Sequence, residues 1–289
     1  MRINFIFFCL GNIIFGNLYP MELSKNNQPS TDLMYLQLQQ ANEEWFKKFG
    51  IVWKTDDFDF WHSPYKDPCV NGITRFSLTN KNKIIENINL IMDYSKQRSI
   101  PFSWSAYPDN NCHELDELFK KSKVAEEESV VMMHSLDTII VNNIPEVSIE
   151  PLQKDDCKEW LAVFNNAFGE YDTNFTETYI QLIQKDLESI DASWKYFAGY
   201  FNKKLVTTGA LLVCSHYGYI ANIGTHQQYR GKGMATAIIV ALLQEAKKLN
   251  MSYVFLQATD AARLYEKIGF QTVVHLKECV FGVDSSQKK

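Results

Sequence analysis

The residues best suited to chemistry form a short stretch with two glycines, Gln228-Tyr229-Arg230-Gly231-Lys232-Gly233, which fits the pattern Q-x-x-G-x-G. Two glycines this close together let a phosphate group approach the main chain without a Cβ in the way. Arg230 and Lys232 add positive charge at the same place. The pattern differs from the phosphate loops of nucleotide triphosphatases and of dinucleotide-binding folds. It predicts a phosphate-binding loop, with an ordinary turn as the alternative.

The elements around this stretch would place it at the start of a helix. Tyr219–Thr225 has the composition of a half-buried strand. Met234–Lys248 has apolar residues at helical spacing: Ile238, Ile239, Leu242, Leu243 and Ala246. The N-terminus of a helix has unpaired N–H groups and about half a positive charge. This order of strand, glycine loop and helix therefore favours the phosphate-binding interpretation.

A second stretch lies downstream, Leu264-Tyr265-Glu266-Lys267-Ile268-Gly269-Phe270. Together with the glycine loop it resembles the GCN5-related N-acetyltransferase (GNAT) superfamily. In that family Q-x-x-G-x-G holds the pyrophosphate of acetyl-CoA, and L-Y-E-K-x-G-F carries a tyrosine often used as general acid. One long helix and one strand separate the two motifs, as in the family. The resemblance extends over about residues 145–283.

The resemblance implies a set of site residues by position. Strand main-chain groups of Ile223, Gly224 and Thr225 would hold the pantetheine and polarise the thioester carbonyl. The implied acetyl-CoA-binding set is Ile223, Gly224, Thr225, Gln228, Arg230, Gly231, Lys232, Gly233, Met234, Ala235 and Thr236. Tyr265 would protonate the departing thiolate, for which a pKa near 10 is suitable. A core tyrosine at helical spacing is the alternative reading of Tyr265.

Two features of the predicted site depart from the family or stay open. Ala258 occupies a position where many members have asparagine, and Thr259 or Asp260 would have to substitute. The sequence does not identify a general base. Titratable residues in suitable segments are Glu170, His216 and Glu278, each with a surface role as the alternative, and a water relay would make a base unnecessary.

Composition limits the class of protein. The chain has 289 residues, 46% hydrophobic and 22% charged, as expected for a globular protein with ample core. A net charge of −5 disfavours a general binder of nucleic acid or of anionic membranes. The six cysteines include no C-x-x-C pair, and the six histidines are scattered. We therefore expect reduced thiols, no disulfide framework and no metal site.

The first half repeats the element order of the second half. The pattern predicts a helix over Leu33–Phe49 and a strand with a flanking loop over Val52–Phe60. The series strand, helix, strand, helix, strand then follows over Ile73–Leu78, Lys83–Tyr94, Phe102–Tyr107, Leu115–Lys123 and Ser129–Ser135. Phe119 falls where Tyr265 falls in the second half, and residues 78–83 contain no Q-x-x-G-x-G. This order predicts a degenerate acetyltransferase-like copy; an unrelated α/β lobe is the alternative.

The second half is expected to begin with a strand over Val147–Ile149 and helices over Asp155–Phe168 and Thr176–Leu187. Antiparallel strands over Tyr196–Tyr200 and Lys204–Ser215 follow, and Tyr253–Gln257 should lie parallel to Tyr219–Thr225. The predicted fold class is therefore α/β in the α+β sense, with a mixed, mostly antiparallel sheet and two GNAT-like units in tandem, the second complete.

Predicted domains are an apolar N-terminal segment and linker over residues 1–32, the degenerate copy over 33–140, and the catalytic domain over 141–289. Residues 1–19 are apolar after Arg2. Met21 as the true initiator, a signal or anchor, and an ordered helix are the alternatives for this segment. We expect a cytoplasmic protein.

The predicted function is transfer of an acetyl group from acetyl-CoA to a primary amine by direct transfer in a ternary complex. The acceptor is either a small-molecule amine or an amine of a protein or peptide, and no nucleic-acid partner is expected. The alternative is a catalytically silent acetyl-CoA-binding or protein-interaction module that uses the N-terminal half, with its tryptophans, to dock a protein partner.

Overall fold

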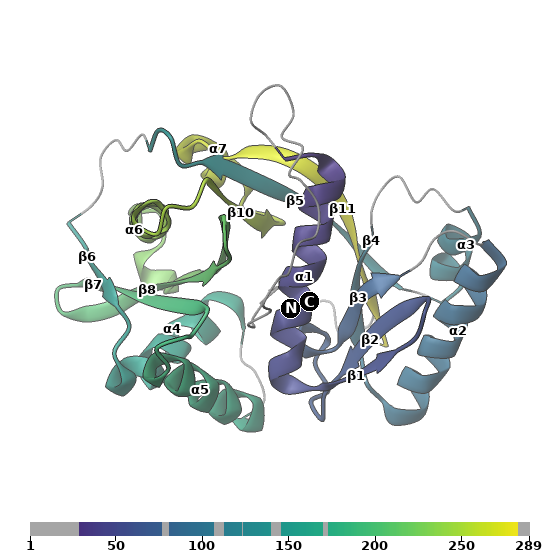
Figure 1. Ribbon diagram of the computed structural model, residues 1–289. Coiled ribbons are helices and arrows are strands. Elements are labelled where there is room, and N and C mark those ends of the chain that lie inside the picture. The colour runs from purple at the N-terminus through teal and green to yellow at the C-terminus, as the bar shows by residue number, and fades with distance from the viewer. Residues whose placement is uncertain are drawn as a thin grey trace. The chain divides into compact units, whose positions relative to one another are not determined.

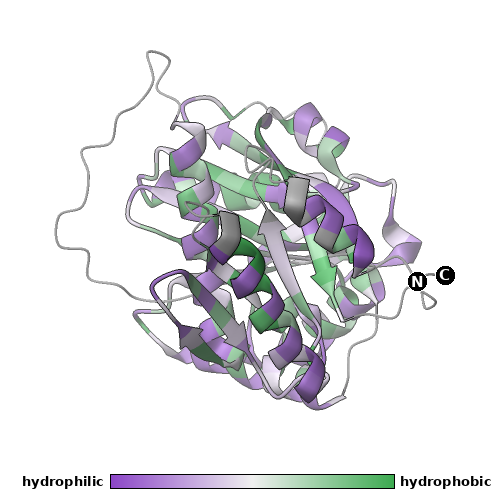
Figure 2. Ribbon diagram, turned by 90° about the vertical axis from the view of Figure 1, so that its right-hand side faces the viewer, coloured by the Kyte–Doolittle hydropathy of each residue, from purple (hydrophilic) through white to green (hydrophobic). Residues whose placement is uncertain are grey.

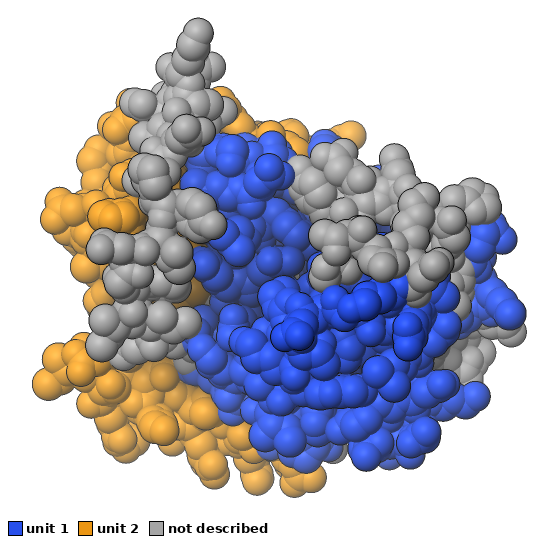
Figure 3. Space-filling model, turned by 45° about the vertical axis from the view of Figure 1, so that its right-hand side comes forward, with its two compact units in different colours: residues 1–131, 273–289 blue, residues 132–272 orange. Residues whose placement is uncertain are grey.

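The structure is a computed structural model that describes residues 29–76, 81–106, 113–122, 124–139, 146–169 and 173–282 (Figure 1). The predictions for residues 1–28, for the loop at 77–80 and for Glu170 lie outside the described residues. The chain divides into two compact units (Figure 3). Unit 1 comprises residues 1–131 and 273–289, and unit 2 comprises residues 132–272.

Unit 1 is built on strands in the order β1-β2-β3-β4-β11-β5. Their bounds are Ile51–Lys54 (β1), Phe58–His62 (β2), Gly72–Phe76 (β3), Phe102–Ala106 (β4), Gln271–Phe281 (β11) and Ala125–Ser135 (β5). β3 and β4 are parallel, whereas β1–β2, β2–β3 and β4–β11 are antiparallel. β11 begins in unit 2, and from Val273 it belongs to unit 1.

Helices of unit 1 are α1 (Thr31–Phe49), α2 (Lys81–Arg98) and α3 (His113–Lys121), with a short 3-10 turn η1 at Pro68–Val70. The hydroxyl of Ser30 caps α1 by accepting a hydrogen bond from the N–H of Leu33 at 3.2 Å. Aromatic rings fill the core of the unit. Phe102 stacks on Phe281 at 4.4 Å between ring centroids, and Phe119 packs edge-on against Phe281 at 5.4 Å.

Unit 2 is built on strands in the order β5-β10-β9-β8-β7-β6. The strands not yet named are Ser148–Pro151 (β6), Trp194–Phe201 (β7), Lys204–Val213 (β8), Tyr217–Thr225 (β9) and Tyr253–Ala258 (β10). β6, β7, β8 and β9 pair antiparallel in series. β9 and β10 are parallel, as the sequence predicts, because a helix connects them.

The helical elements of unit 2 are η2 (Lys154–Asp156), α4 (Cys157–Phe168), α5 (Thr173–Glu188), η3 (Gln227–Tyr229), α6 (Met234–Lys248) and α7 (Ala262–Ile268). α4 is amphipathic, and its buried residues include Trp160 and Phe164. Hydrophilic and hydrophobic residues alternate along the helices of the molecule (Figure 2). None of the helices in the described part of the chain is long and apolar enough to cross a membrane.

The predicted elements are found, with two differences. Val52–Phe60, predicted as one strand with a flanking loop, belongs to two strands, the hairpin β1–β2, with a turn at Thr55–Asp57 between them. The last strand, expected in a second domain of residues 141–289, packs from Val273 onward in unit 1 instead. This placement is a long-range pairing, for which the local sequence pattern has no signal. The order β3, α2, β4, α3, β5 repeats β9, α6, β10, α7, β11, and the predicted mixed α/β fold is confirmed.

Candidate functional site

The candidate site begins where two parallel strands of unit 2 separate. β10 pairs with β9 at Tyr253↔Tyr217, Val254↔Gly218 and Phe255↔Tyr219, and the register ends there. β9 continues to Thr225 and β10 to Ala258 without pairing each other. A gap between parallel strands leaves main-chain groups of both free to bind an extended ligand. The glycine loop follows directly from the far end of β9.

The loop turns sharply into α6 at its two glycines. Gly231 has φ +73° and Gly233 has φ +80°, both in the left-handed region that favours glycine. A Cβ on Gly231 would meet no other atom within 4 Å, so this glycine faces open space. The first intrahelical bond of α6 runs from Ala237 N to Gly233 O. The N–H groups before Ala237, at Gly233, Met234, Ala235 and Thr236, therefore lack intrahelical partners.

The loop is tied to the C-terminal end of α4. The N–H of Gln227 donates to Oδ1 of Asn166 at 2.8 Å, and the Gln227 side-chain amide donates to the Asn166 main-chain oxygen at 3.3 Å. The guanidinium of Arg230 donates to the main-chain oxygens of Ala167, at 2.9 Å, and of Thr225, at 3.3 Å. These contacts fix the loop between β9 and α4 before any ligand arrives.

The two cations of the loop therefore differ in role. Arg230 is exposed, but its guanidinium is committed to carbonyl groups of the protein. Lys232 is exposed as well, and its Nζ donates to the oxygen of Gln228 at 3.3 Å, over the ring of Tyr229. The long lysine side chain can reach an anion at the helix N-terminus by giving up one weak contact. Gln228 itself is exposed in η3.

The three predicted strand residues have different surroundings. Gly224 is buried, its N–H donates to Oγ1 of Thr208 at 3.2 Å, and its oxygen accepts from Oγ1 of Thr207 at 2.7 Å. Thr225 is half-buried and pairs with Thr207. Ile223 is half-buried and has no register partner on β8, because the register shifts between Thr208 and Ala210. This shift is a β-bulge in β9.

Tyr265 lies in α7, a short helix that follows β10 after three residues. It is buried, with its ring 5.7 Å from that of Phe270. Burial raises the pKa of the Tyr265 hydroxyl well above its ordinary value, so the group stays protonated at neutral pH. A buried phenol that keeps its proton can donate it to a base brought against it. Ala258, where the family often has asparagine, is buried at the end of β10.

The end of α7 rests on a buried histidine of β5. Nε2 of His134 lies 3.3 Å from the main-chain oxygen of Ile268, and the imidazole packs on Phe270 at 5.1 Å between centroids. A Cβ on Gly269 would approach Nε2 to 3.0 Å, and Gly269 has φ +109°. Burial lowers the pKa of His134, which favours the neutral imidazole. His134 thus supports the helix that carries Tyr265.

The structure does not bring the predicted candidates for a base together. His216 is exposed before β9, at the strand end remote from the loop. Glu278 belongs to unit 1, where it is fully buried and accepts hydrogen bonds from Ser105 and Ser129 at 2.9 and 3.0 Å. The surface role proposed as the alternative for Glu278 is therefore wrong. Glu170 lies outside the described residues.

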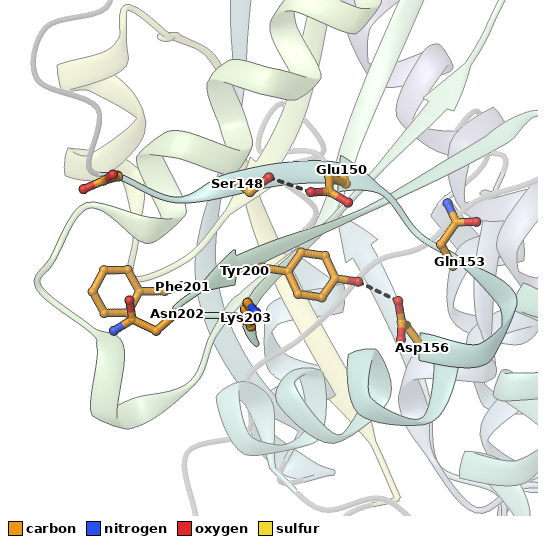
Figure 4. Close-up of a pocket in the computed structure, with 9 residues that line it drawn as sticks. Ser148, Glu150, Gln153, Asp156, Tyr200, Phe201, Asn202 and Lys203 are labelled. Atoms are coloured by element: carbon orange, nitrogen blue, oxygen red, sulfur yellow. Dashed lines mark hydrogen bonds between the residues drawn. The ribbon is translucent and has the colours of Figure 1, made fainter.

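A pocket of about 660 Å³ lies elsewhere in unit 2, on β6, η2 and the β7–β8 turn (Figure 4). Its carboxylates come from Glu146, Glu150 and Asp156, and the Tyr200 hydroxyl donates to Asp156 at 2.7 Å. Lys203 is its one lysine. The pocket shares no residue with the glycine loop or with α7, so it is not part of the candidate site.

Several residues of the site have no recognisable signal in the sequence. Asn166 and Ala167 hold the loop, and Thr207 and Thr208 bond the main chain of Gly224. These contacts depend on pairings across the fold that have no local signature. One signal was present: asparagine is depleted in strand interiors, and Asn222 interrupts the strand Tyr219–Thr225 at the position of the bulge.

Comparisons with known proteins indicate one family for the segment that contains this site. The model of the acetyltransferase (GNAT) family matches residues 157–270, which include α4, the glycine loop and α7. Over 82 residues the chain is 34% identical to an uncharacterized N-acetyltransferase YobR of Bacillus subtilis, covering 27% of this chain and 33% of that protein. Over 150 residues it is 29% identical to a Bacillus cytotoxicus protein named "Putative cysteine ligase BshC", covering 50% of this chain and 26% of that protein. The chain thus spans about a quarter to a third of the curated relatives it matches.

Solved structures share the fold over both units. A GCN5-related N-acetyltransferase from Kribbella flavida matches with a TM-score of 0.64 at 11% identity, covering 87% of this chain and 96% of that one. A conserved protein of unknown function from Staphylococcus epidermidis matches with a TM-score of 0.65 at 14% identity, covering 81% and 95%. Coverage of this extent is consistent with two acetyltransferase-like units in one chain.

Proposed function

We propose that the acetyltransferase (GNAT) domain formed by residues 157–270 transfers an acetyl group from acetyl-CoA to a primary amine, with acetyl-CoA held along β9 and at the start of α6. The observation that carries this proposal is the separation of β9 from β10 immediately before a glycine loop with two left-handed residues. Both features lie inside the segment that matches the family.

The loop and α6 would bind the pyrophosphate. The N–H groups of Gly233, Met234, Ala235 and Thr236 precede the first bond of the helix, where the helix dipole favours negative charge. Open space in front of Gly231 gives the phosphates room. Lys232 is the cation available to them, and Arg230 acts mainly by holding the loop to α4.

The chemical step forms one bond and breaks another. The amine nitrogen, in its neutral form, attacks the thioester carbonyl carbon; the new C–N bond forms, and the C–S bond breaks as the electron pair goes to sulfur. Tyr265 would give its proton to the departing thiolate and regain one from the acetylated amine through solvent. Its hydroxyl is protonated at neutral pH, as a general acid requires, although burial raises its pKa above the value near 10 that matches a thiolate.

In this proposal unit 1 does not catalyse the transfer and has a structural role or a role in recognising the substrate. Phe119, at the position of Tyr265 in the repeated order, is buried against Trp104 and Phe281 and has no hydroxyl to donate. Replacing a proton donor by a hydrocarbon ring removes general-acid chemistry from this position. We therefore assign a single active unit to the chain.

The test is release of thiol from acetyl-CoA by the full chain, measured with a panel of small primary amines, peptides with free N-termini and lysine-containing proteins. We expect release that depends on the amine and is lost in Gly231→Asp. Acetyl-CoA binding without release for any amine would instead favour a silent binding module, and absence of binding would overturn the proposal. The panel also identifies the class of acceptor.

A further inference from the structure

The strand that would hold the acyl group contains a buried residue in an unusual conformation. Asn222 of β9 has φ +60°, a left-handed value that asparagine adopts more readily than most residues but that still costs free energy relative to glycine. It is 3% exposed, and its Oδ1 is buried with no hydrogen-bond partner among the described residues. Unsatisfied buried oxygens and strained residues destabilise a fold. Both at one position mean that the fold bears a local cost at Asn222, as is common at functional sites.

Hydrogen bonds from two neighbouring elements hold Asn222 in place. Its Nδ2 donates to the Tyr179 hydroxyl of α5 at 2.7 Å, and its main-chain oxygen accepts from Oγ1 of Thr208 at 2.8 Å. Oγ1 of Thr208 also accepts from the N–H of Gly224. Tyr179 and Thr208 are fully buried. We name these three residues, Tyr179, Asn222 and Thr208, the bulge clamp.

The clamp lies where the register of β9 changes. Thr208 faces Gly224, but Ala210 faces Ala221, so Asn222 and Ile223 together stand opposite the single residue Gly209. The bulge re-aims the main chain of β9 after its last pair with β10, at Tyr219. Because both main-chain groups of Gly224 are bonded to threonine hydroxyls, Ile223 is the residue whose main chain is presented by the bulge.

We propose that the bulge clamp positions the main chain of Ile223 for the acyl group of acetyl-CoA, so that Tyr179, Asn222 and Thr208 are positioning residues of the transfer reaction. This inference rests on the proposed function and narrows it. Of the predicted strand residues, Ile223 makes the main-chain hydrogen bond to the acyl group of acetyl-CoA. The main chain of Gly224 instead makes the hydrogen bonds that hold the bulge. Tyr179 acts through Asn222, from α5, without contact to the substrate.

The buried ring of Tyr179 explains why the clamp is rigid. Trp160 and Phe164 of α4 and Phe175 of α5 surround it, with centroids 6.4, 6.0 and 6.0 Å away. Burial raises the pKa of the Tyr179 hydroxyl well above its ordinary value, so it remains neutral and keeps its hydrogen bond across the physiological range. A misplacement of about 1 Å at a reacting group can cost on the order of a hundredfold in rate.

The experiment removes each hydroxyl or amide of the clamp with little change in volume. The variants are Tyr179→Phe, Thr208→Val and Asn222→Gly, the last of which keeps the left-handed conformation accessible. Asn202→Gly is the matched control, because Asn202 is also an asparagine with positive φ, +51°, but is exposed in the β7–β8 turn. Circular dichroism and thermal unfolding identify variants that remain folded.

Two readouts separate positioning from a structural role. Affinity for acetyl-CoA is compared with affinity for adenosine diphosphate, which offers a pyrophosphate but no acyl group, and kcat is measured in single turnovers. We expect folded clamp variants to lose roughly tenfold to a hundredfold in kcat and to bind acetyl-CoA more weakly, with adenosine diphosphate affinity unchanged. The double variant Tyr179→Phe with Asn222→Gly should be no worse than Asn222→Gly alone, since the residues act as a unit.

Wild-type kcat and acetyl-CoA affinity in folded Tyr179→Phe and Asn222→Gly would overturn the clamp while leaving the proposed function intact. Equal weakening of acetyl-CoA and adenosine diphosphate would also overturn it, because the effect would then come from the whole domain. If the wild-type chain binds no acetyl-CoA, the proposed function fails and the clamp fails with it.

Discussion

The guanidinium of Arg230 donates to the main-chain oxygen of Ala167 at 2.9 Å, so the glycine loop is held against the end of α4. A second bond, from Nε to the oxygen of Thr225, joins the same side chain to β9. One planar group with several donors thus links three segments. In the structure the guanidinium of Arg230 joins main-chain oxygens, and its predicted contact with the pyrophosphate stays a prediction.

This arrangement predicts that Arg230→Lys weakens acetyl-CoA binding nearly as much as Arg230→Gln. A lysine keeps the charge but cannot donate to both oxygens from the geometry of the guanidinium. We expect a loss of roughly threefold to tenfold, the equivalent of about one hydrogen bond. Calorimetric titration measures it. Wild-type affinity in Arg230→Lys with a loss in Arg230→Gln would show that charge alone matters.

Lys232 provides the complementary prediction, because its ammonium is exposed and held by a hydrogen bond of 3.3 Å and by the ring of Tyr229. Lys232→Gln should weaken acetyl-CoA binding and flatten its dependence on salt, since an exposed cation acts over distances that salt screens. Arg230→Gln should leave more of the salt dependence in place. Titrations at low and high salt test this difference, and equal salt dependence in Lys232→Gln and wild type would refute it.

Tyr265→Phe should slow the chemical step and leave acetyl-CoA affinity nearly unchanged. The ring packing on Phe270 is kept, and only the proton donor is lost. Proton transfer by a placed group contributes typically 10²–10⁴-fold, and a contribution made in the transition state appears in kcat. Single-turnover rates are needed, because slow product release would hide the step. A folded variant with the wild-type rate of acyl transfer would assign the proton to water or to another residue.

His134 predicts a pH dependence of stability. Burial lowers the pKa of His134 in the folded chain below its ordinary value of about 6.5. As the pH falls, this histidine is therefore protonated in the unfolded chain before it is protonated in the folded chain. The contribution of His134 to the free energy of unfolding is therefore fully present above about pH 6.5. It is lost as the pH decreases toward the pKa of His134 in the folded chain. In His134→Gln, whose amide can still donate to Ile268, this part of the decrease should vanish. Urea midpoints between pH 7.5 and 5.5 measure it.

The control for His134 is His216→Gln, because His216 is exposed. That variant should follow the wild-type decrease in stability with pH. If His134→Gln and His216→Gln give the same curve as the wild type, burial of His134 does not set the slope.

The sequence predicts best the features that depend on neighbours along the chain. α6 has the bounds predicted from its apolar spacing, Met234–Lys248, because the stripe and the glycine before it are local signals. The sequence analysis does not predict the β1–β2 hairpin, because the turn residues Thr55, Asp56 and Asp57 include no glycine or proline to divide the two strands. There Thr55 accepts hydrogen bonds from the N–H groups of Asp57 and Phe58, at 3.2 and 2.9 Å, a hydroxyl-based turn without glycine or proline.

Features that join distant segments could not be predicted. Cys279 of β11 is opposite Trp104 of β4, and no periodicity in either strand specifies that partner. The same holds for the contact between Asn222 and Tyr179, which lie 43 residues apart. The motifs located the glycine loop and Tyr265, but the ties from Asn166 and Thr208 that give the loop and strand their geometry appear only in the folded chain.

The most direct measurement is a calorimetric titration of acetyl-CoA into the full chain and into two variants of one glycine, Gly231→Asp and Gly231→Asn. Both new side chains tolerate positive φ better than most and enter the same open space, but only aspartate adds negative charge. We predict one site per chain, with Gly231→Asp binding at least about tenfold more weakly than Gly231→Asn. Two equivalent sites, or wild-type affinity in folded Gly231→Asp, would contradict a single phosphate site at this loop.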